Sequence, residues 1–234
     1  MGIHLFYWLL IRGEGMHFLV FLGSVRESTP PKPARVGERV SQACLKLLNK
    51  TYPEHTVEII DPLDYELGPI FKPEFSYRRS QVPASLSELA EKIKQADGYV
   101  MVSPEYNHSM SPALANILNH FGSSLFSYKP SAIVTYSAGQ WGGARAAVSM
   151  RTFLSELGCL PVSAMIHLPR AQQVFNEEGS VADVSEQDQW DEYMNRTLHQ
   201  LVWWAEGAAQ QRDKLDPTTL AKAFRKDPSQ RNAP

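Results

Sequence analysis

The chain has 234 residues, of which 43% are hydrophobic and 21% charged, a balance typical of a globular protein with a full apolar core. This composition excludes collagen-like, disulfide-rich and broadly disordered chains. Lys and Arg number 23 against 25 Asp and Glu, so the net charge is -2. We therefore expect no nucleic-acid partner, because such binders usually carry a basic surplus.

The N-terminal segment precedes the first clear strand pattern. Residues 3–11 are apolar, but this run is far shorter than the roughly 20 residues that span a membrane. It also lacks the basic start and small-residue cleavage site of a signal peptide. We interpret residues 1–15 as an extension ahead of a domain that starts at Met16. The alternative is a short extra strand, or a hydrophobic arm that docks on a partner subunit.

From Met16 onward, short apolar patterns typical of strands alternate with helical patterns. The five predicted strands lie at residues 17–22, 56–60, 98–102, 132–136 and 162–168. The five predicted helices lie at residues 35–50, 85–95, 112–121, 144–157 and 185–206. A proline-rich connection fills residues 61–83. Alternating strands and helices predict an α/β three-layer sandwich, a parallel sheet with helices on both faces.

The domain pattern ends near Gly207, where the sequence turns polar. Residues 16–207 are therefore predicted to form a single domain, and residues 208–234 a polar C-terminal tail. Within this tail, Asp216 and Pro217 favour one further helical turn, and residues 227–234 have the composition of a frayed end.

The cysteines and histidines give no sign of a metal site. Cys44 and Cys159 lie in apolar segments without a second ligand at metal-binding spacing, so we expect buried thiols in a reducing, cytoplasmic compartment. His55, His167 and His199 are isolated, and satisfied or solvated side chains are the simpler interpretation.

The loop after the first predicted strand has the residues of a phosphate site. Gly23 lets the chain turn sharply, and Ser24, Arg26 and the N-terminus of the next helix are groups that hold phosphates. Arg35 adds a second charge, although residues 27–34 separate the two arginines. The loop lacks the motifs of a P-loop and of a Rossmann dinucleotide site.

The loop after the third predicted strand begins Pro104, Glu105, Tyr106 and Asn107. Pro104 stiffens the exit from the strand, and the Tyr106 side chain is suited to lie against a flat ring. We expect the backbone N–H groups of Tyr106 and Asn107 to meet the heteroatoms of that ring.

The loop after the fourth predicted strand is rich in glycine. It comprises Ser137, Ala138, Gly139, Gln140, Trp141, Gly142 and Gly143. Glycines let a backbone approach a flat ligand closely, so we expect Gly142 and Gly143 to remain small because they lie against such a ligand. Trp141 is suited to cover the ring or a second substrate.

These three loops become neighbours in one particular strand order. In the flavodoxin-like order 2-1-3-4-5, strands one, three and four are adjacent, and ligands bind at their carboxyl ends. A phosphate cradle beside an aromatic loop and a glycine-rich loop is typical of a site for FMN, a mononucleotide with a tricyclic ring. The sequence therefore predicts FMN as the cofactor.

The chain resembles the NADPH-dependent FMN reductase family, a flavodoxin-like group that includes quinone, azo-dye and chromate reductases. The resemblance covers residues 16–205 and rests on Gly-Ser-x-Arg at 23–26, Pro-Glu-Tyr-Asn at 104–107 and Ser-Ala-Gly-x-x-Gly-Gly-x-Arg at 137–145. It departs from the family in the spacing of Arg26 and Arg35. It departs again at Ala115, where the family has a lysine.

The resemblance implies an enzyme that passes hydride from NAD(P)H through FMN to a quinone, azo compound or flavin by a ping-pong mechanism. It implies no catalytic side chain. It also implies a homodimer or homotetramer, with the helices after the second and third loops in the interface and extra aromatic surface at Phe121, Trp203 and Trp204.

Two other functions remain open at this point. The first is a flavin-binding electron carrier or regulatory module without NAD(P)H turnover. Near-neutral charge and the position of Trp141 favour the enzyme over this alternative. The second is a degenerate family member that acts only through protein interactions and binds no flavin.

Overall fold

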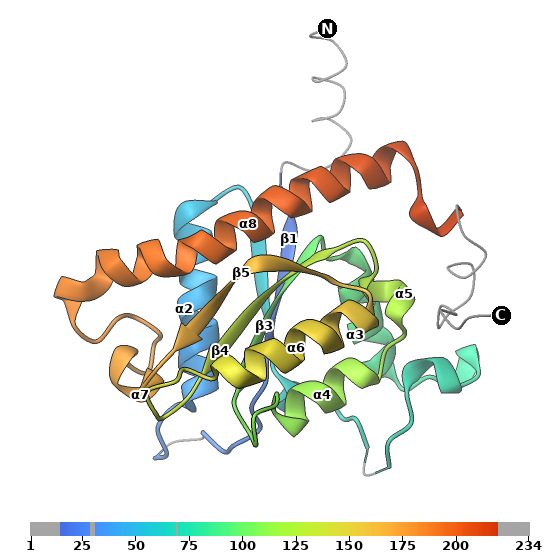
Figure 1. Ribbon diagram of the computed structural model, residues 1–234. Coiled ribbons are helices and arrows are strands. Elements are labelled where there is room, and N and C mark those ends of the chain that lie inside the picture. Colours follow the sequence, from blue (N-terminus) through green and yellow to red (C-terminus); the bar gives the residue numbers. More distant parts are fainter. Residues whose placement is uncertain (1–14, 29–30, 69, 220–234) are drawn as a thin grey trace, which may run out of the picture.

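A five-stranded parallel sheet forms the centre of the molecule (Figure 1). The computed structural model describes residues 15–28, 31–68 and 70–219. The strands are β1 (His17–Leu22), β2 (Thr56–Ile60), β3 (Gly98–Pro104), β4 (Pro130–Tyr136) and β5 (Leu160–Leu168). They pair in the order β2-β1-β3-β4-β5, and every pair is parallel. The predicted fold class and strand order are confirmed.

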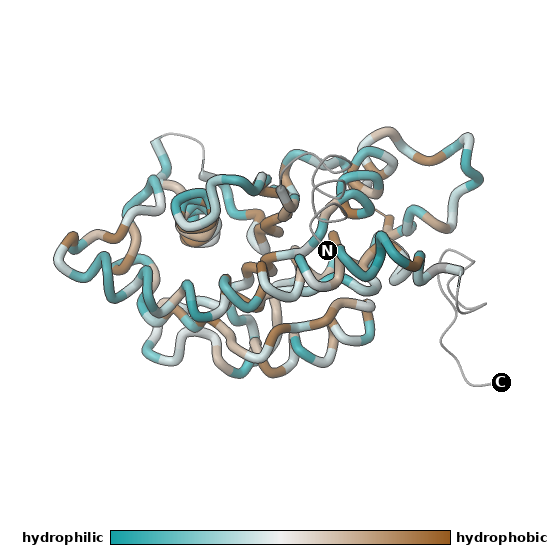
Figure 2. Tube along the Cα trace, turned by 90° about the horizontal axis from the view of Figure 1, so that it is seen from above, coloured by the Kyte–Doolittle hydropathy of each residue, from teal (hydrophilic) through white to brown (hydrophobic). Residues whose placement is uncertain are grey.

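Helices cover both faces of this sheet (Figure 1). One face is packed by α2 (Val36–Thr51), α7 (Ala171–Val174) and α8 (Gln187–Lys214). The other face is packed by α3 (Ala84–Gln95), α4 (Pro112–Asn119), α5 (Ser123–Phe126) and α6 (Ala144–Leu157). Figure 2, seen at right angles to Figure 1, shows hydrophobic stretches gathered between the helical layers and largely hydrophilic outer turns.

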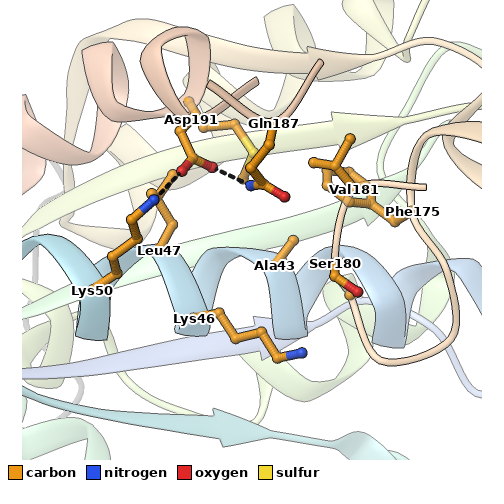
Figure 3. A pocket seen from close by; sticks show the side chains of 11 residues that line it. Ala43, Lys46, Leu47, Lys50, Phe175, Ser180, Val181, Gln187 and Asp191 are labelled. Carbon is orange, nitrogen blue, oxygen red and sulfur yellow. Dashed lines mark hydrogen bonds and ion pairs between the residues drawn. The ribbon is translucent and has the colours of Figure 1, made fainter. Parts of the chain in front are cut away.

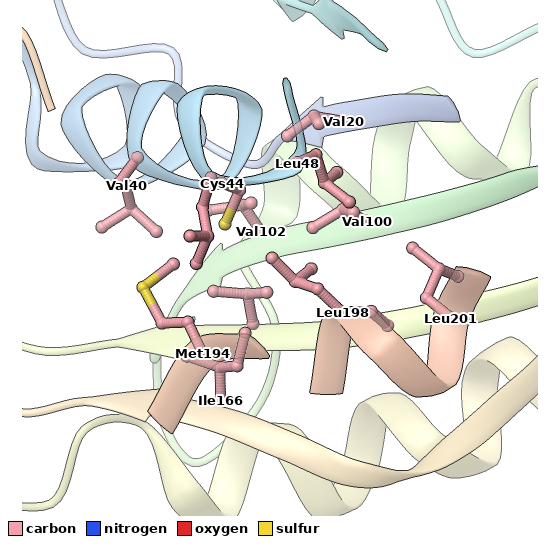
Figure 4. Packing of buried hydrophobic residues seen from close by; sticks show 14 of the residues in the cluster. Val20, Val40, Cys44, Leu48, Val100, Val102, Ile166, Met194, Leu198 and Leu201 are labelled. Carbon is pink, nitrogen blue, oxygen red and sulfur yellow. The ribbon is translucent and has the colours of Figure 1, made fainter. Parts of the chain in front are cut away.

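The core consists of two apolar clusters, one on each face. Side chains alternate along a strand, so β3 sends Val100 and Val102 to one cluster and Tyr99 and Met101 to the other. Figure 4 shows members of the cluster that joins α2 and α8 to the sheet: Val20, Val40, Cys44, Leu48, Val100, Val102, Ile166, Met194, Leu198 and Leu201.

Both cysteines are free and buried, as predicted. Burial raises the pKa of the Cys44 thiol to about 12, because the apolar surroundings disfavour a thiolate. Within the part of the chain that the structure describes, no helix is both long enough and apolar enough to cross a membrane.

The last helix differs most from the sequence prediction. Instead of ending near Glu206, α8 continues through Gly207 to Lys214. Ala209 is fully buried, and the Arg212 guanidinium donates hydrogen bonds to Asp97 and to the Tyr128 carbonyl. These tertiary contacts stabilise helical turns that polar composition alone does not favour.

The middle of the chain shows smaller differences. The helix predicted for residues 112–121 ends at Asn119, and a separate short helix, α5, follows it. The connection at residues 61–83 contains three 3-10 turns: Pro62–Asp64, Glu74–Ser76 and Arg79–Gln81. A further turn, Pro217–Thr219, follows Asp216, as expected. The proposed extension before residue 15 and the tail beyond residue 219 lie outside the described residues, and the division of the chain at 15 and 207 stays a prediction.

Replacing Arg212 tests how the end of α8 is anchored. Its guanidinium lies 2.7 Å from the Asp97 carboxylate, whose side chain is only 9% exposed. We expect Arg212→Ala to lower the free energy of unfolding by about 1–3 kcal/mol, because a nearly buried carboxylate loses a charged partner. Urea denaturation followed by circular dichroism measures this. The control is Gln210→Ala on the exposed side of the same helix; an equal effect of both variants would contradict the anchor.

Candidate functional site

Three loops meet at the carboxyl edge of the sheet, because β1, β3 and β4 are adjacent and parallel. Loop 1 comprises residues 23–28 and 31–35, loop 2 residues 104–111 and loop 3 residues 137–143. Backbone bonds continue the ladder into each loop: Gly23 N donates to Val102 O at 2.8 Å, and Glu105 N donates to Tyr136 O at 3.2 Å. The structure therefore brings the three predicted loops together at one edge.

Loop 1 packs its serine against the start of α2. Ser24 is buried, and its side chain lies beside the Tyr136 phenol at Gly37. A Cβ added at Gly37, in the first turn of α2, would lie 2.6 Å from the Tyr136 hydroxyl oxygen and 3.1 Å from Ser24 Cβ. Glycine at this position therefore lets the first turn of α2, the Ser24 side chain and the Tyr136 phenol pack closely together.

The two arginines of loop 1 have different surroundings. Arg26 is exposed and donates a 2.9 Å hydrogen bond to the Tyr106 hydroxyl, across the mouth of the site. Arg35 is buried, donates to the Ser24 carbonyl at 2.8 Å and forms an ion pair with Asp61. Arg35 therefore holds Ser24 from behind, and a direct contact of its guanidinium with phosphate stays a prediction.

Loop 2 contains a strained two-residue turn. Tyr106 and Ser109 exchange both backbone hydrogen bonds, at 3.0 and 2.9 Å, around Asn107 and His108. Those two residues have φ values of 50° and 61°, the left-handed region that type I′ turns require. The turn already uses the Tyr106 N–H, and the expected contact of the Tyr106 and Asn107 N–H groups with a ring stays a prediction. The half-exposed Tyr106 side chain is what loop 2 presents.

Glu105 joins loop 2 to the first turn of α6, the helix that follows loop 3. Its carboxylate accepts a hydrogen bond from Ala146 N at 3.3 Å, in the first turn of α6. The residue before this helix, Gly143, has no side chain to cap it, so Glu105 supplies an acceptor from a neighbouring loop. Pro104 pairs with Tyr136 at the last position of the β3–β4 ladder.

Packing within the chain gives Gly142 and Gly143 of loop 3 a reason to be small, and their expected contact with a flat ligand stays a prediction. At Gly142, with φ +58°, an added Cβ would lie 2.9 Å from Leu168 N. At Gly143, with φ +79°, it would lie 2.8 Å from the Thr135 Cβ. Both glycines therefore pack against β4 and β5 of their own chain. Gly139 differs, because no heavy atom lies within 4 Å of its added Cβ.

The rest of loop 3 is open to solvent. Ala138, Gln140 and Trp141 are exposed, and the Trp141 side chain keeps 62% of its surface free. The Arg145 guanidinium lies 5.6 Å from the centre of the Trp141 ring. The Ser137 hydroxyl donates to the Gly139 carbonyl at 3.0 Å and so shapes the turn.

Tyr136 is the site residue that the sequence analysis missed. Its place at the end of an apolar strand pattern makes it look like core, and it is only 6% exposed. Burial raises the pKa of its phenol, which therefore stays protonated as a hydrogen-bond donor. A phenol at the last strand position, directly before a glycine-rich loop, is the feature that could have identified it.

Two of the hollows among the described residues lie beside α2 and beside loop 1. One, of about 220 Å³, lies between α2 and α8, where Asp191 is already paired with Lys50 at 2.8 Å and with Gln187 at 2.7 Å (Figure 3). The other is a groove of about 910 Å³ beside loop 1, lined by Val25, Pro62, Tyr65, Leu67, Gly68, Phe71, Pro112, Ala113, Ala115, Asn116 and Asn119.

The donors of the site fit a phosphate next to a flat ring. The Ser24 hydroxyl, the Arg26 guanidinium and the first turn of α2 are suited to a phosphate monoester. Tyr106 and Trp141, 38% and 62% exposed, offer aromatic surface on loops 2 and 3. The described residues include no cluster of three or more His, Cys, Asp or Glu side chains able to hold a metal.

The strand order, with these loops at its carboxyl edge, places the chain in the flavodoxin-like class of α/β proteins. Residues 16–173 match the model of one family within that class, NADPH-dependent FMN reductase. The chain belongs to this family.

Two curated relatives and one solved structure illustrate the similarity. The NADH:(hydroxy)cinnamate reductase subunit CrdA of Vibrio ruber is 34% identical over 117 residues, which are 48% of this chain and 58% of that protein. The NAD(P)H-dependent FMN reductase PA1204 of Pseudomonas aeruginosa is 32% identical over 126 residues, 52% of this chain and 66% of that protein. The chain therefore matches less than two thirds of either relative.

The solved structure supports the fold. FerB, a flavoenzyme NAD(P)H:(acceptor) oxidoreductase from Paracoccus denitrificans, superposes with a TM-score of 0.60 at 19% identity. The alignment covers 82% of this chain and 98% of FerB.

Two glycine variants of loop 3 separate packing from ligand contact. We expect Gly142→Val to lower the free energy of unfolding of the flavin-free protein by at least about 2 kcal/mol, because a positive φ and a close backbone each add cost. The control, Gly139→Ala, enters open space and should change stability by less than about 0.5 kcal/mol. Urea denaturation measures both. Wild-type stability of Gly142→Val would show that packing does not explain this glycine.

Proposed function

We propose that the chain is an FMN-dependent NAD(P)H oxidoreductase that passes hydride to a small acceptor, such as a quinone, an azo compound or a flavin. One observation carries the proposal. The buried Ser24 and the exposed Arg26 lie at the same edge as two loops that expose aromatic rings, Tyr106 and Trp141. Membership of the NADPH-dependent FMN reductase family supports it.

The residues of loop 1 would hold the phosphate of FMN. Ser24 and the first turn of α2 offer neutral donors, and Arg26 offers the positive charge. Arg26 donates a hydrogen bond to the Tyr106 hydroxyl, so one guanidinium links loop 1 to loop 2. Arg35 and Asp61 keep Ser24 in place from behind.

Loops 2 and 3 would hold the ring system. Tyr106 and Asn107 form one side, and the backbone from Ser137 to Trp141 forms the other, with open space at Gly139. FMN, when bound, supplies the chemistry of accepting and donating a hydride. The chain binds and orients the two substrates, which take turns at the exposed Trp141 side of the site in a ping-pong order.

The competing function is a flavin-binding electron carrier or regulatory module. Such a protein needs only to bury the flavin and meet a protein partner. The large exposed surface of Trp141, with Arg145 beside it, offers instead a platform for a second flat substrate, which favours an enzyme.

An anaerobic spectrum tests the proposal. The protein loaded with FMN should lose its yellow absorbance when NADPH is added alone, because hydride transfer needs no acceptor in a ping-pong order. A quinone or azo dye added afterwards should restore the colour. Chemical reduction by dithionite is the control for a competent flavin. A loaded protein that dithionite bleaches and neither NADPH nor NADH bleaches would be an electron carrier.

We propose a homodimer or homotetramer, and the exposed side chains support two separate contact surfaces. α4 and α6 lie on one face of the sheet, whereas Trp203 and Trp204 lie on α8, on the other face. These tryptophans are 58% and 43% exposed and contact each other edge to face. Phe121 is only 2% exposed, so the expectation that it adds aromatic surface is wrong.

Light scattering tests this assembly. We expect a mass of at least two chains, because exposed apolar side chains on opposite faces, Val148 on α6 and Trp203 and Trp204 on α8, allow closed symmetric contacts. Changing Trp203 and Trp204 together to Ser should reduce a tetramer to a dimer. Val184→Ser, at an exposed apolar position before α8, is the control. A mass near 26.3 kDa would reject the proposal.

We also propose a cytoplasmic location with small molecules as substrates and no nucleic-acid partner. Cys44 and Cys159 are buried free thiols, which suits a reducing compartment. The net charge of -2 offers no general surplus for binding phosphate backbones.

A further inference from the structure

We propose that the Tyr136 hydroxyl binds the phosphate at the FMN site. It would give the phosphate a hydrogen bond in place of the contact expected from Arg35. The inference rests on the proposed function, since it concerns how the same site would hold its cofactor. It adds a residue from β4 to a phosphate site whose other members come from β1 and α2.

Tyr136 reaches the phosphate region from a distant strand. β4 is separated from β1 by β3, a distance of about 10 Å between strand axes. The Tyr136 side chain packs within the cluster on the α2 face of the sheet, so it extends across β3 toward loop 1. Its backbone is held by the ladder opposite Pro104 and by the bond from Glu105 N.

The hydroxyl ends between the two groups that define the phosphate position. It lies beside Gly37 in the first turn of α2, next to the Ser24 side chain: an added Gly37 Cβ would contact both the phenol oxygen and Ser24 Cβ. A Cβ at Gly37 would come within 2.6 Å of that oxygen, so the phenol can lie this close to the helix because Gly37 has no side chain. An anion on Ser24 and the helix N-terminus would also contact the phenol.

Arg35 explains why such a donor is needed. Its guanidinium is turned toward the Ser24 carbonyl and Asp61, and its Nε lies 3.6 Å from Glu38. Two carboxylates neutralise this arginine and Glu27 pairs with Lys32, so Arg26 is left as the charged donor of loop 1 without a carboxylate partner among the described residues. A protonated phenol gives the phosphate another hydrogen bond without adding charge to a buried position.

The experiment compares two flavins that differ in the phosphate. FMN and riboflavin are titrated into flavin-free protein, and binding is followed by quenching of flavin fluorescence. We expect Tyr136→Phe to weaken FMN about tenfold, as for the loss of one hydrogen bond to a charged group, and to change riboflavin less than twofold. Arg26→Ala should lower the same preference.

A matched control separates phosphate contact from general loss of a buried phenol. Tyr99 in β3 is also fully buried, and its hydroxyl donates to the Ile93 carbonyl at 2.8 Å, far from loop 1 in the opposite cluster. Tyr99→Phe should lower the melting temperature without changing the ratio of FMN to riboflavin affinity.

A second variant approaches the hydroxyl from the helix. Gly37→Ala adds a methyl group against the phenol oxygen, so it should weaken FMN in the wild-type background and cost less once Tyr136 is Phe. The coupling between Gly37→Ala and Tyr136→Phe in FMN affinity is measured in the same titrations. It compares four proteins, so a loss of stability in one variant does not decide the result.

Each outcome has a distinct meaning. An unchanged preference for FMN in Tyr136→Phe overturns the inference, and so does tighter FMN binding, which would make the phenol a competitor of the phosphate. Either result leaves the proposed function intact as long as NADPH still bleaches the bound flavin. A wild-type protein that binds neither flavin would overturn the proposed function itself.

Discussion

The parallel pairing of β3 with both β1 and β4 is the constraint on which the rest of the molecule depends. It sends three chain segments out of the sheet at the same edge, where the strand ladder no longer satisfies their backbone groups. The loops therefore satisfy one another. Glu105 caps α6 from loop 2, and Arg26 bonds Tyr106 between loops 1 and 2. The site is shaped by these mutual contacts before any ligand is considered.

Strain at this edge is concentrated where the loops turn. Asn107 and His108 hold positive φ values without being glycine. Gly142 and Gly143 also have positive φ values, and neighbouring strands leave no room for a side chain at either position. Such conformations persist only where surrounding contacts over-determine them. The β3–β4 ladder on one side and the bond from Glu105 to α6 on the other provide those contacts. Both hold the ends of loops 2 and 3 in place.

The sequence predicts the architecture well because both faces of the sheet are covered. Buried parallel strands appear as continuous apolar runs, and all five runs become strands of the expected sheet. It fails where one tertiary contact overrides local composition. The end of α8 depends on Arg212 meeting Asp97, and the burial of Arg35 depends on Asp61, a residue far away in the chain. No local pattern around Arg212 or Arg35 contains that information.

The same limit applies to Gly142 and Tyr136. A glycine-rich loop resembles a ligand contact, yet the space that Gly142 needs is taken by the backbone of β5. A tyrosine at the end of an apolar strand resembles core, yet the Tyr136 hydroxyl lies beside Gly37 of α2 and next to Ser24 of loop 1. In a parallel sheet, a side chain that is long enough to pass over one strand joins a site two strands away. Strand order therefore decides which residues at the edge act together, and chain order alone does not.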